Sequence, residues 1–146
     1  MDLRGIEHII DEYRARYHEI YAKGLRYFMG NRIVMYVVKN SEIRMFNVRG
    51  EEDEYWVIFL GEDWLCSCPD YFFNIAMRKT ERKYCSHIIA CIMYLAKISE
   101  NAKDRNLKQE STSPTISELG VGKLLEIVYK NIERVRSSLI CTKQKG

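Results

Sequence analysis

The chain has 146 residues, of which 47% are apolar and 29% charged, and its formal net charge at pH 7 is +3. This length supports one ordinary core and excludes two large independent domains. The small net charge excludes a protein that binds nucleic acid through its overall field, although a local basic patch is compatible with it. We find no signal or transit peptide pattern, and the longest apolar run, Ile88 to Ala96, is shorter than the roughly 20 residues of a membrane span. We therefore expect an intracellular, soluble protein of the cytoplasm, nucleoid or nucleus.

Residues 1–30 predict one amphipathic helix. Apolar side chains recur at steps of three and four residues with charged residues between them, which places them on one face of a helix. The pattern ends at Gly30 and Asn31, and a helix this regular is expected to pack on a core. The apolar positions are Ile6, Ile9, Ile10, Tyr13, Tyr17, Ile20, Tyr21 and Phe28.

Residues 31–100 predict a small β layer followed by a core helix. Runs rich in β-branched and aromatic residues at 33–38, 43–48 and 55–60 are separated by turn-type residues, which indicates three antiparallel strands in a meander. A short extended segment then ends at Pro69. From Ser86 to about Ser99 the residues are apolar almost all round, so we expect a buried helix with Ser86 as its N-cap.

Residues 101–113 are polar and predict a linker, and residues 114–146 predict a C-terminal amphipathic helix with a tail. Thr115 and Glu118 resemble a capping box at the start of that helix. Its apolar residues recur at alternating spacings of four and three, which is typical of a helix that packs along a seam. The helix either folds back on its own core or docks on a protein partner or a second copy. The seam residues are Val121, Leu125, Val128, Ile132, Val135 and Leu139.

Between the strands and the core helix lie two pairs of metal-binding residues, Cys66 with Cys68 and Cys85 with His87. Side chains two apart on an extended chain point to the same side, so both sulfurs of the first pair can reach one ion. Two helical residues that are two apart diverge, so the second pair converges only if Cys85 precedes the helix and His87 lies in its first turn. Three thiolates and one imidazole complete a tetrahedral Zn²⁺ shell and leave no position for water or substrate.

Cys91 is an alternative fourth ligand, because it follows His87 by four residues on the same helical face. Buried free thiols are the other explanation for these cysteines, but two pairs beside turn and cap signals favour one structural zinc ion. The chain shows no phosphate-binding glycine loop in the right context, no clustered carboxylates and no free nucleophile with a base. We therefore expect a protein that is not an enzyme and has no small-molecule substrate.

A basic loop, Arg78, Lys79, Arg82 and Lys83, lies between the two ligand pairs and follows a run of aromatic residues. Cations that contact phosphate and aromatic rings that stack on bases together suit a single strand of nucleic acid. The other interpretation is that the aromatic residues cover the zinc site and the cations form a solvated loop.

The order Cys-x-Cys, a loop and Cys-x-His, with Ala90 one turn after His87, resembles the SWIM zinc finger. The β segments before Cys66 and the apolar helix after His87 are similar to the β-β-α layout of that family, so the predicted fold is α+β. Members of the family bind DNA or protein partners. The extended Cys-x-His-x-x-Ala form is similar to small stand-alone SWIM proteins that accompany RecA-family recombinase paralogues, as in the Shu complex. The resemblance implies a heterodimeric adaptor in homologous recombination and DNA repair, or else a DNA-binding regulator of transcriptional or transposase-derived type.

Overall fold

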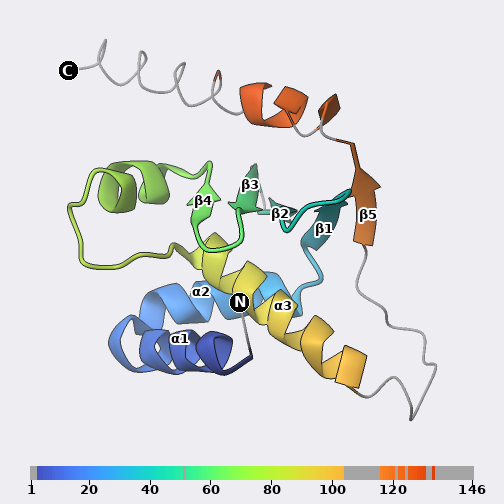
Figure 1. The fold of residues 1–146 in the computed structure, drawn as a ribbon. Helices are drawn as coiled ribbons and strands as arrows, with labels where there is room; N and C mark the ends of the chain where they lie inside the picture. Colours follow the sequence, from blue (N-terminus) through green and yellow to red (C-terminus); the bar gives the residue numbers. More distant parts are fainter. Residues whose placement is uncertain are drawn as a thin grey trace.

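A computed structural model describes residues 3–50, 52–103, 116–120, 122–123, 125–130 and 133. The fold is α+β, as the sequence predicts, with helices packed on one face of a sheet (Figure 1). None of the helices in the described part of the chain combines the length and apolar character needed to cross a bilayer. In chain order the elements are α1 (Leu3–Arg16), α2 (His18–Met29), β1 (Ile33–Val38), β2 (Arg44–Arg49), β3 (Glu54–Phe59), β4 (Trp64–Cys66), the π-helix η1 (Tyr71–Ala76), α3 (Ser86–Lys103) and β5 (Ile116–Leu119).

The N-terminal region forms two helices where the sequence predicts one. Tyr17 interrupts the helix with φ −126° and ψ 59°, and α2 starts at the next residue. The hydroxyl of Tyr13 accepts hydrogen bonds from the backbone N–H groups of Lys83 and Tyr84, each at 3.0 Å. Both helices contact α3, so the break separates two segments that pack on the same core helix.

The sheet has the order β4-β3-β2-β1-β5 among the residues described. The predicted meander of β1, β2 and β3 is confirmed, because Val48 of β2 is paired antiparallel with Ile33 on one side and with Tyr55 on the other. The short extended segment predicted before Pro69 is β4, which pairs with β3. Its pairing brings the end of β4 alongside the middle of β3, at the edge of the sheet.

Residues 116–119 are a strand, β5, at the place where the sequence predicts the first turn of the C-terminal helix. β5 pairs parallel with β1, with Met35 opposite Ile116 and Val38 opposite Leu119. This corrects the capping-box interpretation of Thr115 and Glu118. A free edge of β1 leaves backbone N–H and C=O groups without partners, and a strand supplies them. The strand edge that needs a partner belongs to β1, about eighty residues earlier in the chain, so the local sequence around Thr115 does not indicate the pairing.

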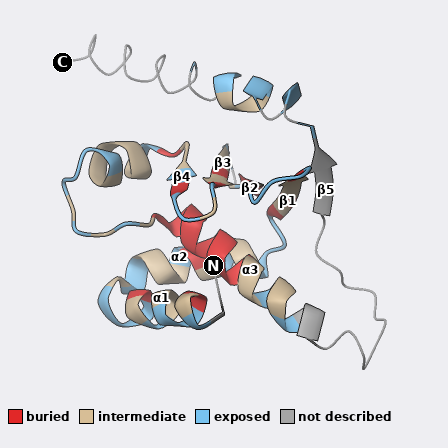
Figure 2. Ribbon diagram, viewed as in Figure 1, coloured by how far each residue is buried: buried red, intermediate tan, exposed pale blue. Residues whose placement is uncertain are grey.

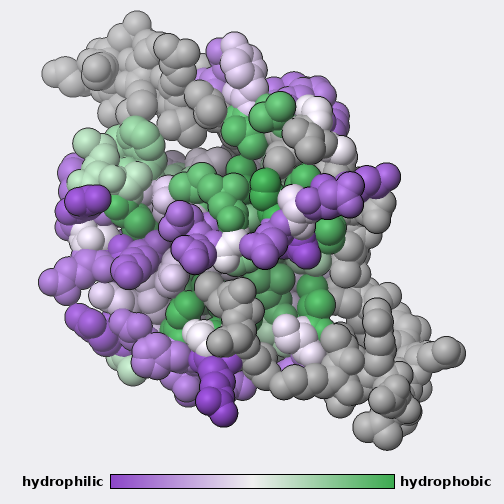
Figure 3. Space-filling view, in the orientation of Figure 1, coloured by the Kyte–Doolittle hydropathy of each residue, from purple (hydrophilic) through white to green (hydrophobic). Residues whose placement is uncertain are grey.

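Apolar side chains cover both faces of the sheet. The inner core lies between the sheet and the helices, and the first turns of α3 are buried almost all round (Figure 2). A smaller outer cluster lies on the opposite face, where Val38 and Met45 are buried and Ile127 and Val128 pack against them. In Figure 3 apolar side chains lie over the sheet and reappear on the helical residues above it, whereas hydrophilic side chains cover α1. The sheet is therefore the central layer.

The predicted C-terminal seam is described only in part. Val128 is half-buried in the outer cluster, while Leu125 is 62% exposed. Ile127, which the seam does not include, also packs against the sheet. The described part of this segment therefore folds back onto its own sheet. The seam positions Val121, Ile132, Val135 and Leu139 lie outside the described residues, as do residues 104–113 of the predicted linker.

Candidate metal centre

The structure brings together Cys66, Cys68, Cys85 and His87, which we call the ligand cluster. Their metal-binding atoms all lie within 4.8 Å of one another. Cys68, Cys85 and His87 are buried, and Cys66 is half-buried as a residue. One pair comes from the end of β4 and the turn after it, and the other lies at the start of α3. The two chain segments that carry the predicted ligand pairs thus meet at one site.

The start of α3 has the geometry that the second pair requires. The backbone N–H of Ile89 donates to the carbonyl of Cys85 at 3.0 Å, so Cys85 accepts the first helical hydrogen bond and is the N-cap. This moves the cap one residue before Ser86, the position predicted from the sequence. His87 then lies in the first turn, with its Nδ1 at 3.9 Å from the Cys85 sulfur. The cap thus points both side chains toward the same place.

The first pair is held by backbone contacts on either side of it. Ser67, between the two cysteines, accepts a hydrogen bond on its Oγ from the backbone N–H of Trp56 at 2.9 Å, and its own N–H donates to the Trp56 carbonyl. The backbone N–H of Tyr71 donates to the Cys68 sulfur at 3.3 Å. A backbone donor of this kind stabilises a thiolate. β3 and η1 therefore fix the two sulfurs in place.

The buried cysteines of the ligand cluster differ in the direction of their pKa shifts. Burial raises the pKa of the Cys66 and Cys85 thiols well above their ordinary value. Hydrogen bonds from these two thiols hold the pKa of Cys68 far below its ordinary value. A thiol must lose its proton to bind a metal ion, so metal binding at Cys66 and Cys85 is coupled to the release of protons. Three sulfurs and one imidazole nitrogen, enclosed in this way, fit a tetrahedral Zn²⁺.

His87 sits between two aromatic rings. Its ring centroid lies 5.0 Å from that of Tyr27 on α2 and 4.5 Å from that of Tyr55 on β3. Nδ1 contacts the Cys85 sulfur, and the geometry therefore assigns this nitrogen to the metal. Nε2 is buried and has no hydrogen-bond partner among the described residues. The two tyrosines thus determine the orientation of the imidazole ring.

Cys91 is not part of the ligand cluster in the described structure. Its side chain is fully buried in the inner core, and burial raises the pKa of its thiol well above the ordinary value. A neutral thiol packed among apolar residues behaves as a small hydrophobic side chain. Of the two residues that the sequence leaves open as the fourth donor, the structure places His87 with the three cysteines.

The four cations of the basic loop have two different environments. Arg82 is 12% exposed and donates to both carboxylate oxygens of Asp70, at 2.9 and 2.8 Å. Arg82 also holds the pKa of Asp70 below its ordinary value, and Asn74 donates to the same carboxylate at 2.7 Å. Arg82 therefore ties the loop to the turn that follows Cys68. The remaining cations, Arg78, Lys79 and Lys83, are exposed.

The aromatic residues between the two pairs lie partly over the metal centre. The Tyr71 hydroxyl donates to the Trp64 carbonyl at 3.1 Å, and burial raises the pKa of Tyr71, as do the nearby cysteine charges. Phe72 and Phe73 are half-buried and meet edge to face, with centroids 5.1 Å apart. Tyr71 thus covers the cluster.

Asp70 is the site residue that reasoning from the sequence missed. It lies two residues after Cys68 and twelve before Arg82, a separation too long for a helical or strand period to indicate the contact. The one available signal was its position directly after Cys68 and Pro69, at the start of the loop that also carries the four cations.

Comparisons of the chain with protein-family models, with curated proteins and with solved structures find no match.

Proposed function

We propose that this chain is a structural zinc module of the SWIM type that acts as a non-catalytic adaptor for a protein partner. The observation that carries the proposal is the buried set of three cysteines and one histidine within 4.8 Å. Four protein ligands leave a tetrahedral ion no open position, so it cannot activate water or polarise a substrate. Its role is to lock the start of α3 to the end of β4.

The proposed partner is a RecA-family recombinase paralogue, and the proposed setting is DNA recombination and repair. The support is the resemblance of the Cys-x-Cys and Cys-x-His-x-x-Ala order to small stand-alone SWIM proteins. Ala90 is fully buried on α3 among the inner-core residues, which agrees with a requirement for a small side chain at that point. The exposed Leu125 and Tyr129 on the C-terminal segment offer apolar contacts for a protein partner.

Metal content and complex formation test the two parts of the proposal separately. Elemental analysis of the purified full chain should give one zinc per chain, and complete removal of zinc should abolish the cooperative thermal transition. Coexpression with each RecA-family paralogue from the same source, followed by native mass spectrometry, should give a one-to-one complex. A zinc-loaded chain that remains alone with every paralogue would contradict the adaptor role while leaving the zinc assignment intact.

The second candidate function is direct binding of single-stranded DNA. The exposure of Arg78, Lys79 and Lys83, in the segment between the ligand pairs that also carries Phe72 and Phe73, favours it. Fluorescence anisotropy with single-stranded and duplex DNA at two salt concentrations tests it, because contacts to phosphate make affinity fall as salt rises. A variant with Arg78, Lys79 and Lys83 changed to Gln should lose binding. Absence of binding at low salt would exclude this function.

A further inference from the structure

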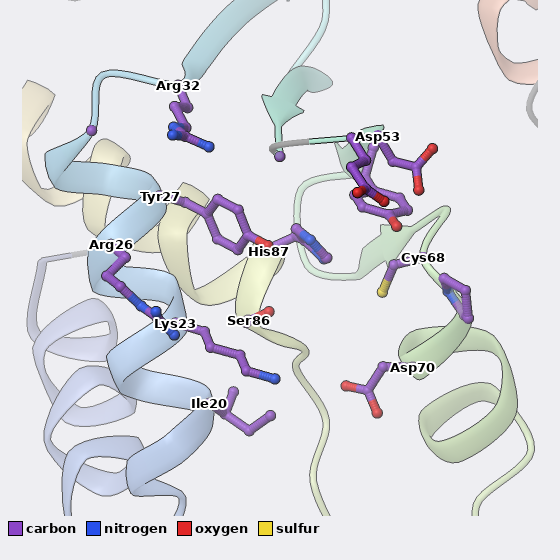
Figure 4. A pocket seen from close by; sticks show the side chains of 15 residues that line it. Ile20, Lys23, Arg26, Tyr27, Arg32, Asp53, Cys68, Asp70, Ser86 and His87 are labelled. Atoms are coloured by element: carbon purple, nitrogen blue, oxygen red, sulfur yellow. The ribbon is translucent and has the colours of Figure 1, made fainter.

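A cavity of about 780 Å³ lies between α2 and the ligand cluster (Figure 4). Its size is within the range of small-molecule binding sites. Tyr27, Tyr55 and His87 line its inner part, and Cys68 with Pro69 lines the side toward the metal. The cavity is distinct from the basic loop, because none of that loop's cations lines it.

One wall of the cavity carries three cations. Lys23 and Arg26 are three residues apart on α2 and so lie on the same helical face, and Arg32 reaches in from the segment after the helix (Figure 4). Within the described part of the chain, no carboxylate lies within ion-pair distance of any of the three. Three like charges spread along one wall, each on an exposed side chain and none in an ion pair among the described residues, favour an anionic ligand on that side.

The opposite wall carries acidic groups. Asp53 and Asp70 lie across the cavity from the cations (Figure 4), and Glu52 also lines it. The Asp70 charge is balanced by Arg82, so this carboxylate does not offset the cationic wall. A ligand that fits both walls has an anionic group at one end and hydrogen-bond donors, such as sugar hydroxyls or base amino groups, at the other.

The inner part of the cavity offers aromatic surface. Tyr27 and Tyr55 each contact the His87 ring, and both tyrosines are half-buried, so part of each ring remains open to the cavity. Aromatic side chains of this kind bind a nucleobase by stacking on it. Arg26 and Arg32 have planar guanidinium groups that match a phosphate with two parallel hydrogen bonds.

We propose that this cavity binds a nucleotide. The phosphate lies against Lys23, Arg26 and Arg32, the base lies against Tyr27 or Tyr55, and the sugar faces the acidic wall. The nucleotide is either a free mononucleotide or the phosphorylated end of a nucleic acid strand, since both present the same chemistry. This site goes beyond the adaptor role, and it requires the fold with its metal centre intact but no protein partner.

Binding is measured on the zinc-loaded full chain, with the zinc content of every sample confirmed. Isothermal titration calorimetry with adenosine monophosphate, which carries both a base amino group and two sugar hydroxyls, and with inorganic phosphate compares a nucleotide with its anion alone. Anisotropy of a short oligoadenylate, labelled at its 3′ end and either carrying or lacking a 5′ phosphate, tests the strand end. The test variant is Arg26→Gln with Arg32→Gln, and the matched control is Arg78→Gln with Lys79→Gln, which removes equal charge from the basic loop.

We expect the nucleotide to bind more tightly than inorganic phosphate, and the test variant to weaken nucleotide binding about tenfold or more through the lost guanidinium contacts. The control variant should leave mononucleotide binding unchanged. Binding of the monophosphate identifies a free nucleotide, and binding only of the 5′-phosphorylated strand identifies a strand end. The proposal is overturned if neither probe binds, if inorganic phosphate binds as tightly as the nucleotide, or if both variants weaken binding equally.

Discussion

The two faces of the sheet are closed in different ways. On the inner face, α1, α2 and α3 enclose a core that is continuous with the ligand cluster. On the outer face, the smaller cluster around Val38 and Met45 is covered by residues from the far end of the chain, of which Ile127 and Val128 are only half-buried. The inner face should therefore carry most of the stability, and the outer face should tolerate change.

The difference has a physical basis in what each contact removes from water. Any ion held by the ligand cluster and a helix buried almost all round are lost together when the inner face opens. On the outer segment Leu125 and Tyr129 remain 62% and 65% exposed, so its helix buries one side only. Four measurements, from the largest expected effect to the smallest, test this contrast.

Cys85→Ser should have the largest effect, because it removes a ligand-cluster thiol while a serine still caps the start of α3, so the loss reports on the metal site alone. Structural zinc sites are worth on the order of 10 kcal/mol, so the variant should lose both its zinc and its cooperative unfolding transition. Elemental analysis and calorimetry measure the two losses. Cys91→Ala is the control and should retain one zinc per chain with a modest loss of stability. If Cys91→Ala loses the metal, the fourth ligand is misassigned.

Gly24→Ala should destabilise the crossing of α2 and α3. A Cβ at Gly24 would lie 2.9 Å from Ile89 Cγ2 and 3.0 Å from the Ser86 carbonyl, beside the ligands Cys85 and His87. Overpacking costs about 1 to 3 kcal/mol, and better helix propensity offsets about 1 kcal/mol of it. Denaturant unfolding of the zinc-saturated protein measures the difference. Gly120→Ala, which meets nothing within 4 Å, should be neutral, and equal stability of both variants would argue against a tight crossing.

The inner face should also weaken at alkaline pH through Tyr94. Burial, and to a lesser extent the nearby Cys91, raises the pKa of Tyr94 to about 12. Between pH 10 and 12 the unfolded chain releases this proton while the folded chain keeps it, so the free energy of unfolding falls as pH rises. The share of Tyr94 is about 1 kcal/mol at pH 11. Tyr94→Phe should flatten the curve in this window and the exposed Tyr129→Phe should not; identical curves would refute the effect.

Val128→Ala should have the smallest effect, about 1 kcal/mol or less, because the side chain is only half-buried in the outer cluster. Zinc content should not change. Denaturant unfolding measures the loss, and Leu125→Ala serves as the exposed control on the same segment. A loss as large as that of Gly24→Ala would mean that the outer face contributes to the fold as strongly as the inner face.

Much of the inner face could be predicted because its signals are local. The runs of β-branched and aromatic residues in β1 to β3, the near-continuous apolar run of α3 and the two-residue spacing within each ligand pair can all be recognised within short stretches of the chain. The interruption at Tyr17 could not be predicted in this way. Tyr17 continues the apolar period of residues 1–30, and Tyr13, one turn before it, accepts hydrogen bonds from Lys83 and Tyr84, some seventy residues away.

The sequence by itself determined the α+β class, the meander and the two candidate ligand pairs, with Cys91 left as an alternative to His87, because spacing along a strand or across a helix cap is set by local geometry. Tertiary structure alone decided that His87 rather than Cys91 joins the cysteines, and that Arg82 forms an ion pair with Asp70. It also decided that residues 116–119 form the strand β5. Each of these depends on which group from a distant segment satisfies a buried charge, a metal-binding atom or an unpaired strand edge. Folding brings such groups together, and the number of residues between them along the chain does not reveal which groups will meet.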